Sequence, residues 1–580
     1  MTRKHTIFPY AALLLALSAC NDGNEFGDGY QVSLGSTSIS ANANAGISVS
    51  PTTLTFSATS AAAQTVSVTA SASWTVKTEA TWLTLSKTSG TGSDTFTVTA
   101  ADNNDTTDRS ATITLTCGEA TTTVSVIQEN ILKVWGSLTA IMFIDNAVRL
   151  SWNIDDDAIH SIKAVPTTDT GAPTITAYVS SATFEKGYID VYGLKPETVY
   201  SVYAYKDSIT QDNSTYAGCM TGTTLAAPNF DEKYGAGKWL DIRNWDEKEA
   251  KDTLKTVEFW AAIPDGAAII LRGEQEYKVN NSVKFNGSYT FVTGPTLGGN
   301  ARFISSGGLT CASGASIQKL QFEDIDFISD KALTGGSNEI ATNTDKGFGG
   351  RQVFNNNGTN STVEELVFKN CSMTGYRSIV RVQNANDAIQ KLTFKGCTIN
   401  GVGDQGVVTT NNKAADWRSV TFDDCTITNI VMLCDLRATA GEMTFTVKNC
   451  TFCYAPIETT SNKNTPLFRF GSNGITLNIT NSFFGPSMAS TGSTGDDVLT
   501  YQAGTAGSIL LDNQEAQVSV THSFKTKYDW TLIVEATYPI DALTELNMTE
   551  TELWKAPAEG DFTVIGNVGE TGIGASKWQQ

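Results

Sequence analysis

Histidine is almost absent from this chain, since its 580 residues include only His5, His160 and His522. Zinc sites of the HExxH kind and other sites built from several histidines are therefore excluded. A Ser/His/Asp triad has at most two bases to draw on, because His5 lies in a segment that we expect to be removed. No basic cluster follows residue 4, and 60 acidic against 40 basic residues give a net charge of -20. A nucleic-acid partner is not expected, because such binding depends on Lys and Arg against phosphates.

The chain also has few helix-forming stretches. Only 17% of its residues are charged, Gly occurs 49 times, and long segments consist of Thr, Ser, Val and Asn. This composition is typical of an all-β protein. A domain usually holds roughly 100 to 200 residues, so we expect about three to five modules.

No apolar run is long enough to span a membrane as a stable helix. The run at residues 7–17 follows two basic residues and precedes Leu-Ser-Ala-Cys20. We expect residues 1–20 to be a lipoprotein signal peptide with Cys20 as the lipidated first residue; an ordinary signal peptide is the alternative. The acyl group is then the only membrane attachment.

Residues 21–45 are expected to form a flexible tether that begins with Asn, Asp and Gly. This start resembles the acidic tether of surface-exported lipoproteins of gut Bacteroidota. The resemblance implies lipid anchoring in the outer membrane at the cell surface; a periplasm-facing anchor is the alternative. An acidic linker that serves solubility alone explains the residues equally well.

Residues 46–129 alternate between apolar and polar side chains in about seven short segments, which predicts an antiparallel β-sandwich. The order of Trp74, Trp82, Gly90, Arg109 and Gln128 resembles the BACON domain. The resemblance implies a secreted, glycan-related protein. The two tryptophans are expected to fill the core, with stacking on sugar rings as the alternative.

Residues 132–226 carry Trp152 on an early predicted strand and, about 40 residues later, Leu194, Pro196, Thr198 and Tyr200. These four stand at the spacing of the corner in fibronectin type III domains, whose Tyr fixes the turn before the next strand, so the segment resembles that family. The resemblance implies a second β-sandwich that acts as a spacer; a ligand site is the alternative.

Residues 228–580 contain six copies of one eight-residue pattern. The copies begin at Leu320, Leu366, Leu392, Val420, Phe445 and Leu477, at intervals of 46, 26, 28, 25 and 32 residues. Such intervals indicate a solenoid. Apolar residues occupy the first and third places, two polar residues follow, and apolar residues resume at the sixth and eighth places. This change of phase marks a corner between two strands that face one interior, and it predicts a right-handed parallel β-helix.

The segment around Leu254 has helical spacing, with Ala250, Val257 and Ala261 on the same face. We expect it to cover the first turn of the β-helix, because an exposed sheet edge invites aggregation.

Four cysteines, Cys371, Cys397, Cys425 and Cys450, share the sixth place of the pattern. Their side chains should stack on successive turns and point the same way, too far apart for the roughly 3.5 to 4.5 Å between Cβ atoms in a disulfide. We expect buried, reduced thiols that act as small hydrophobic groups, and no metal site.

The entry at residues 264–271, the repeated pattern and the tail at residues 552–578 together resemble the pectate-lyase-like β-helix lipoproteins of Bacteroidota, whose function is uncharacterised. Strands before the later copies carry Arg377, Arg381, Arg437 and Arg469. Arg381 and Arg469 each lie between apolar neighbours and should face outward. We expect Arg381, Arg437 and Arg469, together with exposed aromatic side chains, to bind a polysaccharide, with an outer-membrane glycan-uptake complex as a further partner.

Two alternatives remain open. The first is a lyase that cleaves uronate-containing glycans by Arg- or Lys-assisted β-elimination, with either Ca²⁺ or a positive side chain to neutralise the uronate carboxylate; the binding protein itself is expected to need no cofactor. The sequence lacks the acidic cluster of pectate lyases, and Asp435 with Arg437 could equally form a surface ion pair. The second alternative is a structural or adhesive stalk.

Overall fold

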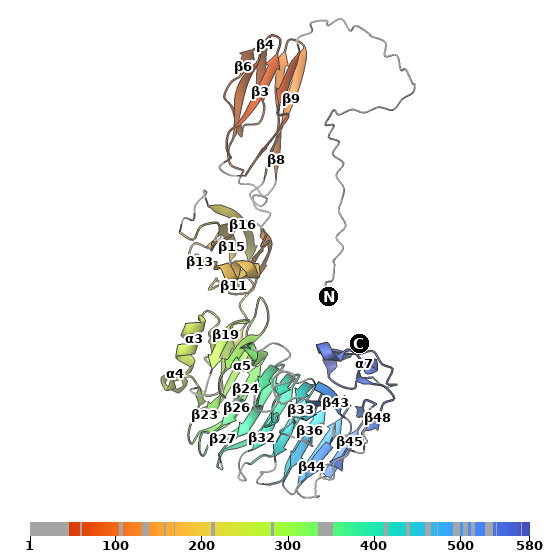
Figure 1. Cartoon of the computed structure of the whole chain (residues 1–580). Coiled ribbons are helices and arrows are strands. Elements are labelled where there is room, and N and C mark those ends of the chain that lie inside the picture. The colour runs from red at the N-terminus through yellow and green to blue at the C-terminus, as the bar shows by residue number, and fades with distance from the viewer. Residues whose placement is uncertain are drawn as a thin grey trace, which may run out of the picture. The chain divides into compact units, whose positions relative to one another are not determined.

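The computed structural model (Figure 1) describes residues 46–58, 61–103, 108–129, 138–155, 158–167, 169–209, 211, 215–279, 283–334, 352–384, 386–410, 416–436, 441–458, 466–471, 474–490, 499–502, 508–511, 517–527, 538–540, 542–569 and 571–579. The predicted signal peptide, Cys20 and the tether lie outside these residues. The chain is all-β, with two β-sandwiches followed by a right-handed parallel β-helix, which confirms the predicted fold class. None of the described helices is long and apolar enough to cross a membrane.

The first sandwich has two sheets whose apolar residues alternate inward. One sheet has the order β1 (Ile47–Ser50), β3 (Gln64–Ala70), β7 (Asp94–Ala100), β5 (Leu83–Leu85); the other has β2 (Thr53–Phe56), β9 (Ala120–Gln128), β8 (Arg109–Cys117), β4 (Ser73–Thr78), β6 (Ser89–Thr91). Trp74 is buried in the core, as expected, and its Nε1 donates to the carbonyl of Gly92 at 3.0 Å. Trp82 is partly exposed.

The Gln that closes this sandwich is also buried. The side-chain amide of Gln128 donates to the backbone carbonyls of Ser57, Ala58 and Ala101, and its Oε1 accepts from the guanidinium of Arg109. Arg109 and Gln128 therefore join the ends of strands that are distant in sequence.

The second sandwich pairs a three-stranded with a four-stranded sheet. The orders are β10 (Leu138–Phe143), β11 (Ala147–Trp152), β14 (Tyr188–Tyr192), and β13 (Ile175–Tyr178), β12 (Ser161–Pro166), β15 (Val199–Tyr205), β16 (Tyr216–Thr223), with α1 (Ser181–Lys186) before β14. The backbone N–H of Lys195 donates to the hydroxyl of Tyr200 at 3.0 Å, which confirms the predicted corner. Trp152 is buried and stacks on Phe184 of α1.

The β-helix has three faces, which we call sheets 1, 2 and 3, and Figure 1 shows them as a stack of short strands coloured from green to blue. Sheet 1 contains β17 (Trp239–Asp241), β18 (Ala267–Leu271), β21 (Tyr289–Thr293), β24 (Ser316–Glu323), β27 (Thr362–Lys369), β30 (Ala388–Lys395), β33 (Ser419–Asp423), β36 (Met443–Lys448), β40 (Ile475–Thr480) and β45 (Gln517–Thr521). Sheet 2 contains β19 (Glu276–Val279), β22 (Ala301–Ser305), β25 (Ile325–Ser329), β28 (Ser372–Tyr376), β31 (Thr398–Val402), β34 (Thr426–Ile430), β37 (Thr451–Cys453), β41 (Phe483–Phe484), β46 (Phe524–Lys525) and β48 (Thr544–Glu545). Sheet 3 contains β26 (Gln352–Asn356), β29 (Ser378–Val382), β32 (Val408–Thr410), β35 (Cys434–Leu436), β39 (Phe468–Phe470), β44 (Ser508–Leu511) and β47 (Tyr538–Pro539).

Shorter strands complete the β-structure of this module. They are β20 (Lys284–Phe285) with β23 (Thr310–Cys311), β38 (Ile457–Glu458) with β42 (Ser487–Ser490) and β43 (Leu499–Gln502), and β49 (Trp554–Ala556) with β50 (Asp561–Val564). A short helix, α5 (Asp330–Thr334), follows β25.

The six predicted copies lie in register on β24, β27, β30, β33, β36 and β40 of sheet 1. The structure adds β17, β18 and β21 before them and β45 after them, so the coil is longer than the pattern indicates. The fifth residue of every copy has a left-handed backbone, with φ between 48° and 65°, and it is Asp, Asn or Gly each time. These residue types accept that conformation most readily, so the polar pair in the pattern is the corner between sheets 1 and 2.

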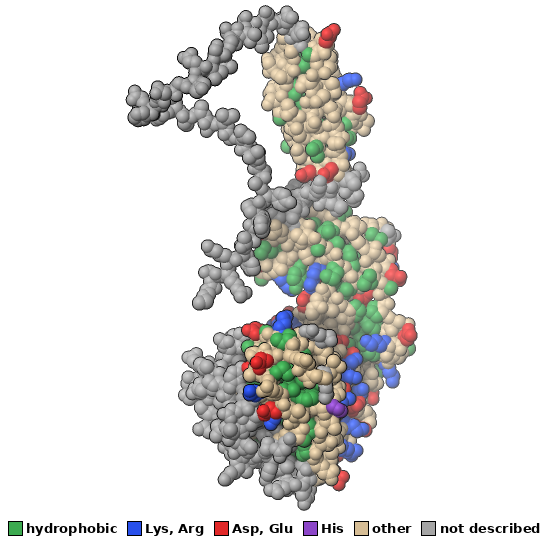
Figure 2. Space-filling model, turned by 90° about the vertical axis from the view of Figure 1, so that its right-hand side faces the viewer, with side chains coloured by type: hydrophobic (Ala, Val, Ile, Leu, Met, Phe, Trp, Pro, Cys, Tyr) green, Lys and Arg blue, Asp and Glu red, His purple; other side chains and the backbone are tan. Residues whose placement is uncertain are grey.

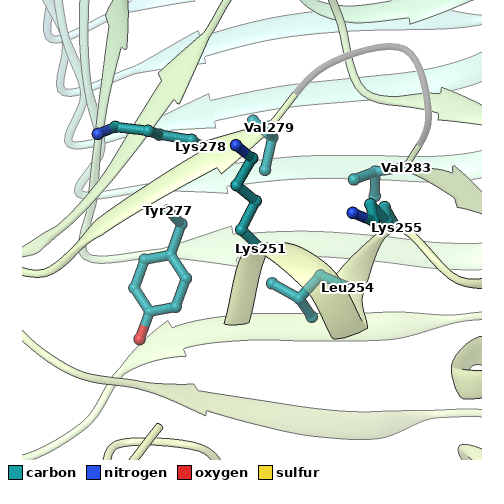
Figure 3. Close-up of a pocket in the computed structure, with 7 residues that line it drawn as sticks. All are labelled: Lys251, Leu254, Lys255, Tyr277, Lys278, Val279 and Val283. Atoms are coloured by element: carbon teal, nitrogen blue, oxygen red, sulfur yellow. The ribbon is translucent and has the colours of Figure 1, made fainter. Parts of the chain in front are cut away.

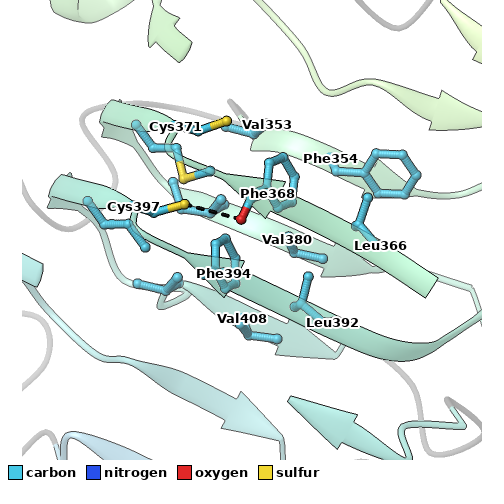
Figure 4. Close-up of a cluster of buried hydrophobic side chains, with 14 of the residues drawn as sticks. Val353, Phe354, Leu366, Phe368, Cys371, Val380, Leu392, Phe394, Cys397 and Val408 are labelled. Atoms are coloured by element: carbon cyan, nitrogen blue, oxygen red, sulfur yellow. Dashed lines mark hydrogen bonds between the residues drawn. The ribbon is translucent and has the colours of Figure 1, made fainter. Parts of the chain in front are cut away.

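Two stacks of side chains fill the interior behind this corner. The Phe stack is Phe291, Phe322, Phe368, Phe394, Phe422 and Phe445, whose successive ring centroids are 5.2, 5.3, 5.2, 4.7 and 5.8 Å apart. The Cys stack is Cys371, Cys397, Cys425 and Cys450, all buried as predicted. Each Sγ lies 3.3–3.6 Å from the carbonyl oxygen of the Phe one turn earlier, as Figure 4 shows for Cys397 and Phe368. The S–H groups of the thiols, which are weak hydrogen-bond donors, thus have carbonyl acceptors inside an apolar core.

Helices cover the first turns of the coil. They are α2 (Phe230–Tyr234), α3 (Glu247–Leu254) and α4 (Val257–Ala262). Ala250, Leu254 and Trp260 belong to the same buried core as Phe285 and Phe291, which confirms the predicted cap. Val257 and Ala261 were expected on the covered face, but both are exposed, Val257 to 70%, because the segment breaks at Lys255 into two helices.

The second sandwich and the β-helix share a buried ion-pair network. The Arg243 guanidinium donates two bonds to Asp145 of the sandwich, at 2.8 and 2.7 Å, and is also bonded to Asp241. Arg243 is fully buried. Ile144 and Ala147 of the sandwich pack with Leu297 of the β-helix beside this network. The two modules therefore meet at a desolvated contact as well as through the chain.

Candidate functional site

The outer wall of sheet 1 is charged but balanced. Lys369 pairs with Glu323 at 2.6 Å, Lys319 with Glu365 at 3.4 Å, Lys391 with Glu364 at 3.7 Å and Lys448 with Asp423 at 3.1 Å. Figure 2 shows basic and acidic side chains intermixed along one edge of the β-helix rather than gathered by sign. Exposed pairs of this kind add little stability, and they neutralise most of the charge on this wall.

The wall of sheet 2 is partly covered by the C-terminal segment. After α7 (Glu550–Leu553), Trp554, Phe562 and Ile573 pack in one cluster with Phe483. The backbone N–H and hydroxyl of Ser576 donate to Asp424, and Trp578 Nε1 donates to Thr426 at 2.7 Å. The tail residues that carry the family resemblance thus cover part of this face.

The wall of sheet 3 carries a row of polar side chains at matching positions on five strands. The register aligns Asn355, Arg381, Thr409, Asp435 and Arg469, which we call the sheet 3 row. Strands in a sheet lie about 4.8 Å apart, so the row extends over about 19 Å along the coil axis. Arg381 and Arg469 lie between buried neighbours and point outward, as predicted from the alternation. The structure therefore brings together two of the three predicted arginines.

Arg381 differs from its neighbours because no described residue pairs with it. Arg377, by contrast, donates to both carboxylate oxygens of Asp404, at 2.6 and 2.9 Å. Burial, and then the nearby charge of Arg377, lowers the pKa of Arg381. Arg381 is thus a half-buried cation whose counter-charge is not supplied by the described part of the chain.

Asp435 and Arg469 form the other half of the row. Arg469 Nη1 lies 3.8 Å from Asp435 Oδ2. The expected pairing of Asp435 with Arg437 is not tested, because Arg437 lies outside the described residues. An acidic group between two cations gives the row both acceptors and donors of hydrogen bonds.

Two buried polar atoms near the row lack hydrogen-bond partners among the described residues. They are Asn355 Oδ1 and Thr410 Oγ1. Asn355 Nδ2, in contrast, donates to Gln383 at 2.9 Å. Buried polar atoms are normally paired, so a wall that leaves them unpaired is suited to a ligand with hydroxyl groups.

Two further features were considered for the site, namely exposed aromatic side chains and a cluster of metal ligands. Aromatic side chains were expected along the wall, but all aromatic side chains among the described residues of the β-helix are buried or only partly exposed. The alternation that places arginines outward puts the aromatic residues inward. In the described part of the chain no group of three or more His, Cys, Asp or Glu side chains could hold a metal ion.

A cavity beside α3 is too small to serve as a binding site. Lys251, Lys255 and Lys278 surround it together with Leu254 and Tyr277 (Figure 3), and its volume is about 30 Å³. Such a space holds a water molecule but no sugar ring.

Comparison with known proteins supports the first module most directly. Residues 72–129 match the BACON family, described as "Putative binding domain, N-terminal", which confirms that resemblance. No curated protein matches the chain. A Yersinia enterocolitica family 28 exopolygalacturonase is 10% identical over 70% of this chain and 84% of its own, with a TM-score of 0.26. A Bacteroides ovatus GH5 xyloglucanase in complex with a XXXG heptasaccharide is 13% identical over 55% of this chain and 65% of its own, with a TM-score of 0.15. A two-domain fibronectin type III segment of chicken tenascin is 14% identical over 30% of this chain and 95% of its own, with a TM-score of 0.12. Likenesses this weak assign no function to this chain.

Proposed function

We propose that this chain is a lipid-anchored cell-surface protein whose β-helix binds an acidic polysaccharide along the wall of sheet 3. The single observation that carries the proposal is the sheet 3 row, in which Arg381 has no acidic partner among the described residues. A glycan with uronate groups supplies such a counter-charge. The Arg fork binds a carboxylate through two parallel hydrogen bonds, which favours Arg over Lys in this role.

The form of the β-helix supports a linear ligand. Equivalent positions repeat on successive strands, so a solenoid wall presents donors and acceptors along a line. Thr409 and Asp435, which lie between the two arginines, and Asn355, which lies on the other side of Arg381, offer groups that bind sugar hydroxyls. The family match at residues 72–129 and the N-terminal pattern ending at Cys20 support a role in an outer-membrane glycan-uptake system.

Binding to pectins and other acidic glycans on an array tests the proposal. The triple variant Arg381→Ala, Arg437→Ala, Arg469→Ala should bind at least about tenfold more weakly, because a hydrogen bond to a charged group contributes about 1.5–3 kcal/mol. Arg302→Ala is the matched control, since it removes one partly exposed cation from β22 in sheet 2. Unchanged binding by the triple variant would contradict the proposal.

Lyase activity is a second candidate function. The pKa of Arg381 is lowered by burial and by Arg377, and β-elimination needs a base with a pKa closer to the working pH. The lyase predicts a rise in ultraviolet absorbance from unsaturated uronate products, lost in Arg381→Ala. If Ca²⁺ takes part, a chelator abolishes that rise. A stalk predicts neither binding nor turnover.

A further inference from the structure

A second cavity lies where the second sandwich meets the β-helix. We call it the junction cavity; its volume is about 330 Å³, and its wall includes Tyr188, Asp190 and Tyr192 of β14. The other side is formed by the turn at residues 272–275 and by the start of α3. Its volume lies within the range of about 300–1,000 Å³ that is usual for ligand pockets, and domain boundaries are a common place for them.

An ion-pair network holds this wall in place. Arg149 donates two bonds to Asp190, both at 2.7 Å, and one to Glu274 at 2.6 Å. Its guanidinium also lies 3.9 Å from the ring centroid of Tyr188. The sandwich and the β-helix thus fix the two sides of the cavity relative to each other.

Two polar side chains of the wall have unused hydrogen-bond donors. Gln275 is 7% exposed, and its Nε2 has no partner among the described residues. Arg272 lies 4.1 Å from the ring centroid of Tyr192 and donates from Nε to the carbonyl of Arg243, but no described residue accepts from its Nη atoms. A buried amide without a partner is costly, so a ligand that pairs with it gains affinity.

The charges of the wall indicate the class of ligand. Lys186 and Arg272 face four acidic residues, Asp190, Asp246, Glu247 and Glu274, two of which are bonded to Arg149. Counting Arg149, three cations face these four acids, and Glu247 also lies near Lys278, so the charges of the wall nearly cancel and favour neither an anion nor a metal ion. A neutral ligand whose groups both donate and accept fits this mixture best, because a hydroxyl can satisfy either kind of partner.

We infer that the junction cavity binds a neutral, hydroxyl-rich ligand, a neutral sugar unit, at a site separate from the sheet 3 row. Arg272 and Gln275 donate to its hydroxyl oxygens, and Asp246 accepts from its hydroxyl groups. This site requires both modules, since neither side encloses the cavity alone. It does not depend on acidic glycan binding by sheet 3.

Calorimetric titration of the full mature chain with neutral mono- and oligosaccharides, and with the matching uronic acids, tests this inference. We expect a neutral sugar to bind, and Gln275→Leu to weaken it at least tenfold. Glu247→Trp should have a similar effect, because Glu247 is exposed and a bulky side chain there narrows the cavity. Arg302→Ala should change nothing.

The triple variant of the arginines tested for sheet 3 separates the two proposals. It should retain neutral sugar binding whether or not acidic glycans bind to sheet 3. Hydrogen exchange at the N–H groups of Gly193 and Leu194, which both donate to the carbonyl of Asn146, shows whether each variant keeps the junction intact. The inference is overturned if no neutral sugar binds at millimolar concentration. It is also overturned if Gln275→Leu or Glu247→Trp keeps an intact junction and binds the sugar with unchanged affinity.

Discussion

Replacement of Arg243 should open the junction between the second sandwich and the β-helix. The side chains of Arg243 and Asp145 are 2% and 4% exposed, whereas that of Asp241 is 23% exposed. In Arg243→Met, Asp145 is left as a buried carboxylate without its cation, while Asp241 can be hydrated. Removing one partner of a buried ion pair costs about 3–5 kcal/mol, mostly through the charge that stays behind.

The same network predicts a marked asymmetry between variants. In Asp145→Asn, the guanidinium of Arg243 keeps its three hydrogen bonds to Asp241, so the cost should be only about 1–2 kcal/mol. The double variant Arg243→Met, Asp145→Asn contains no buried charge without a partner. It should therefore regain at least about 2 kcal/mol of the stability that Arg243→Met loses at the junction. These values follow from burial rather than from the number of hydrogen bonds.

Hydrogen exchange in the full chain measures the opening locally. The N–H groups of Gly193, Leu194 and Leu225 lie at the junction and donate to Asn146 and Ile144. A loss of about 3–5 kcal/mol corresponds to a fall in their protection by about two to three and a half powers of ten, since 1.36 kcal/mol is a factor of ten. The N–H of Gly396, deep in the β-helix, serves as the control.

The pH dependence gives an independent check. A buried carboxylate without a cation has a folded-state pKa above its unfolded value, so the native state binds more protons and its stability rises as the pH falls. The stability that Arg243→Met loses relative to the natural protein should therefore become smaller as the pH falls from neutral toward ~4. The reasoning is refuted if Arg243→Met costs no more than Asp145→Asn, or if the double variant is as open as Arg243→Met.

Four further predictions concern the core and the junction. Burial raises the pKa of the Cys371 and Cys425 thiols, so a thiol reagent should leave them unmodified in the native protein and react with them after denaturation; fewer free thiols after denaturation would indicate disulfides. Phe394→Ala removes the middle of the Phe stack and should lower the free energy of unfolding of the β-helix by about 3–5 kcal/mol in urea, whereas a loss below about 1 kcal/mol would mean that the stack collapses around the gap. Gly90→Ala places a Cβ 2.3 Å from the Trp74 ring and should destabilise the first sandwich by about 1–3 kcal/mol, seen as a lower Tm; an unchanged Tm would show that the indole can move. Burial raises the pKa of Tyr192 to about 12, so the folded state favours the neutral phenol, and the stability of the protein should fall as the pH rises above about 10. Ionisation of Tyr192 near pH 10, measured as the difference in phenolate absorbance between the natural protein and Tyr192→Phe, would contradict this.

The sequence by itself determined the fold class and the phase of the β-helix. Strand alternation and the corner residues are local properties: Asn370 or Gly396 takes a left-handed backbone because of its own chemistry, and Leu366 and Phe368 face inward because the period of a strand is two. For the same reason Arg381 and Arg469 were correctly predicted to face outward. The eight-residue pattern does not reach the turns before Leu320, because Thr293 and its neighbours lack the polar corner, although these strands pair in register with β24.

Tertiary structure alone decided what surrounds each of these side chains. No local pattern indicates that Arg377 is neutralised by Asp404 while Arg381 has no partner among the described residues, because the partner of Arg377 comes from a different turn of the coil. The C-terminal tail covers part of sheet 2 and bonds to Asp424, which is 152 residues away from Ser576 in sequence. The junction cavity likewise depends on Arg149 and Glu274, which are 125 residues apart. Burial and pairing are properties of residues brought together by folding, and they determine which walls of this β-helix are left for a ligand.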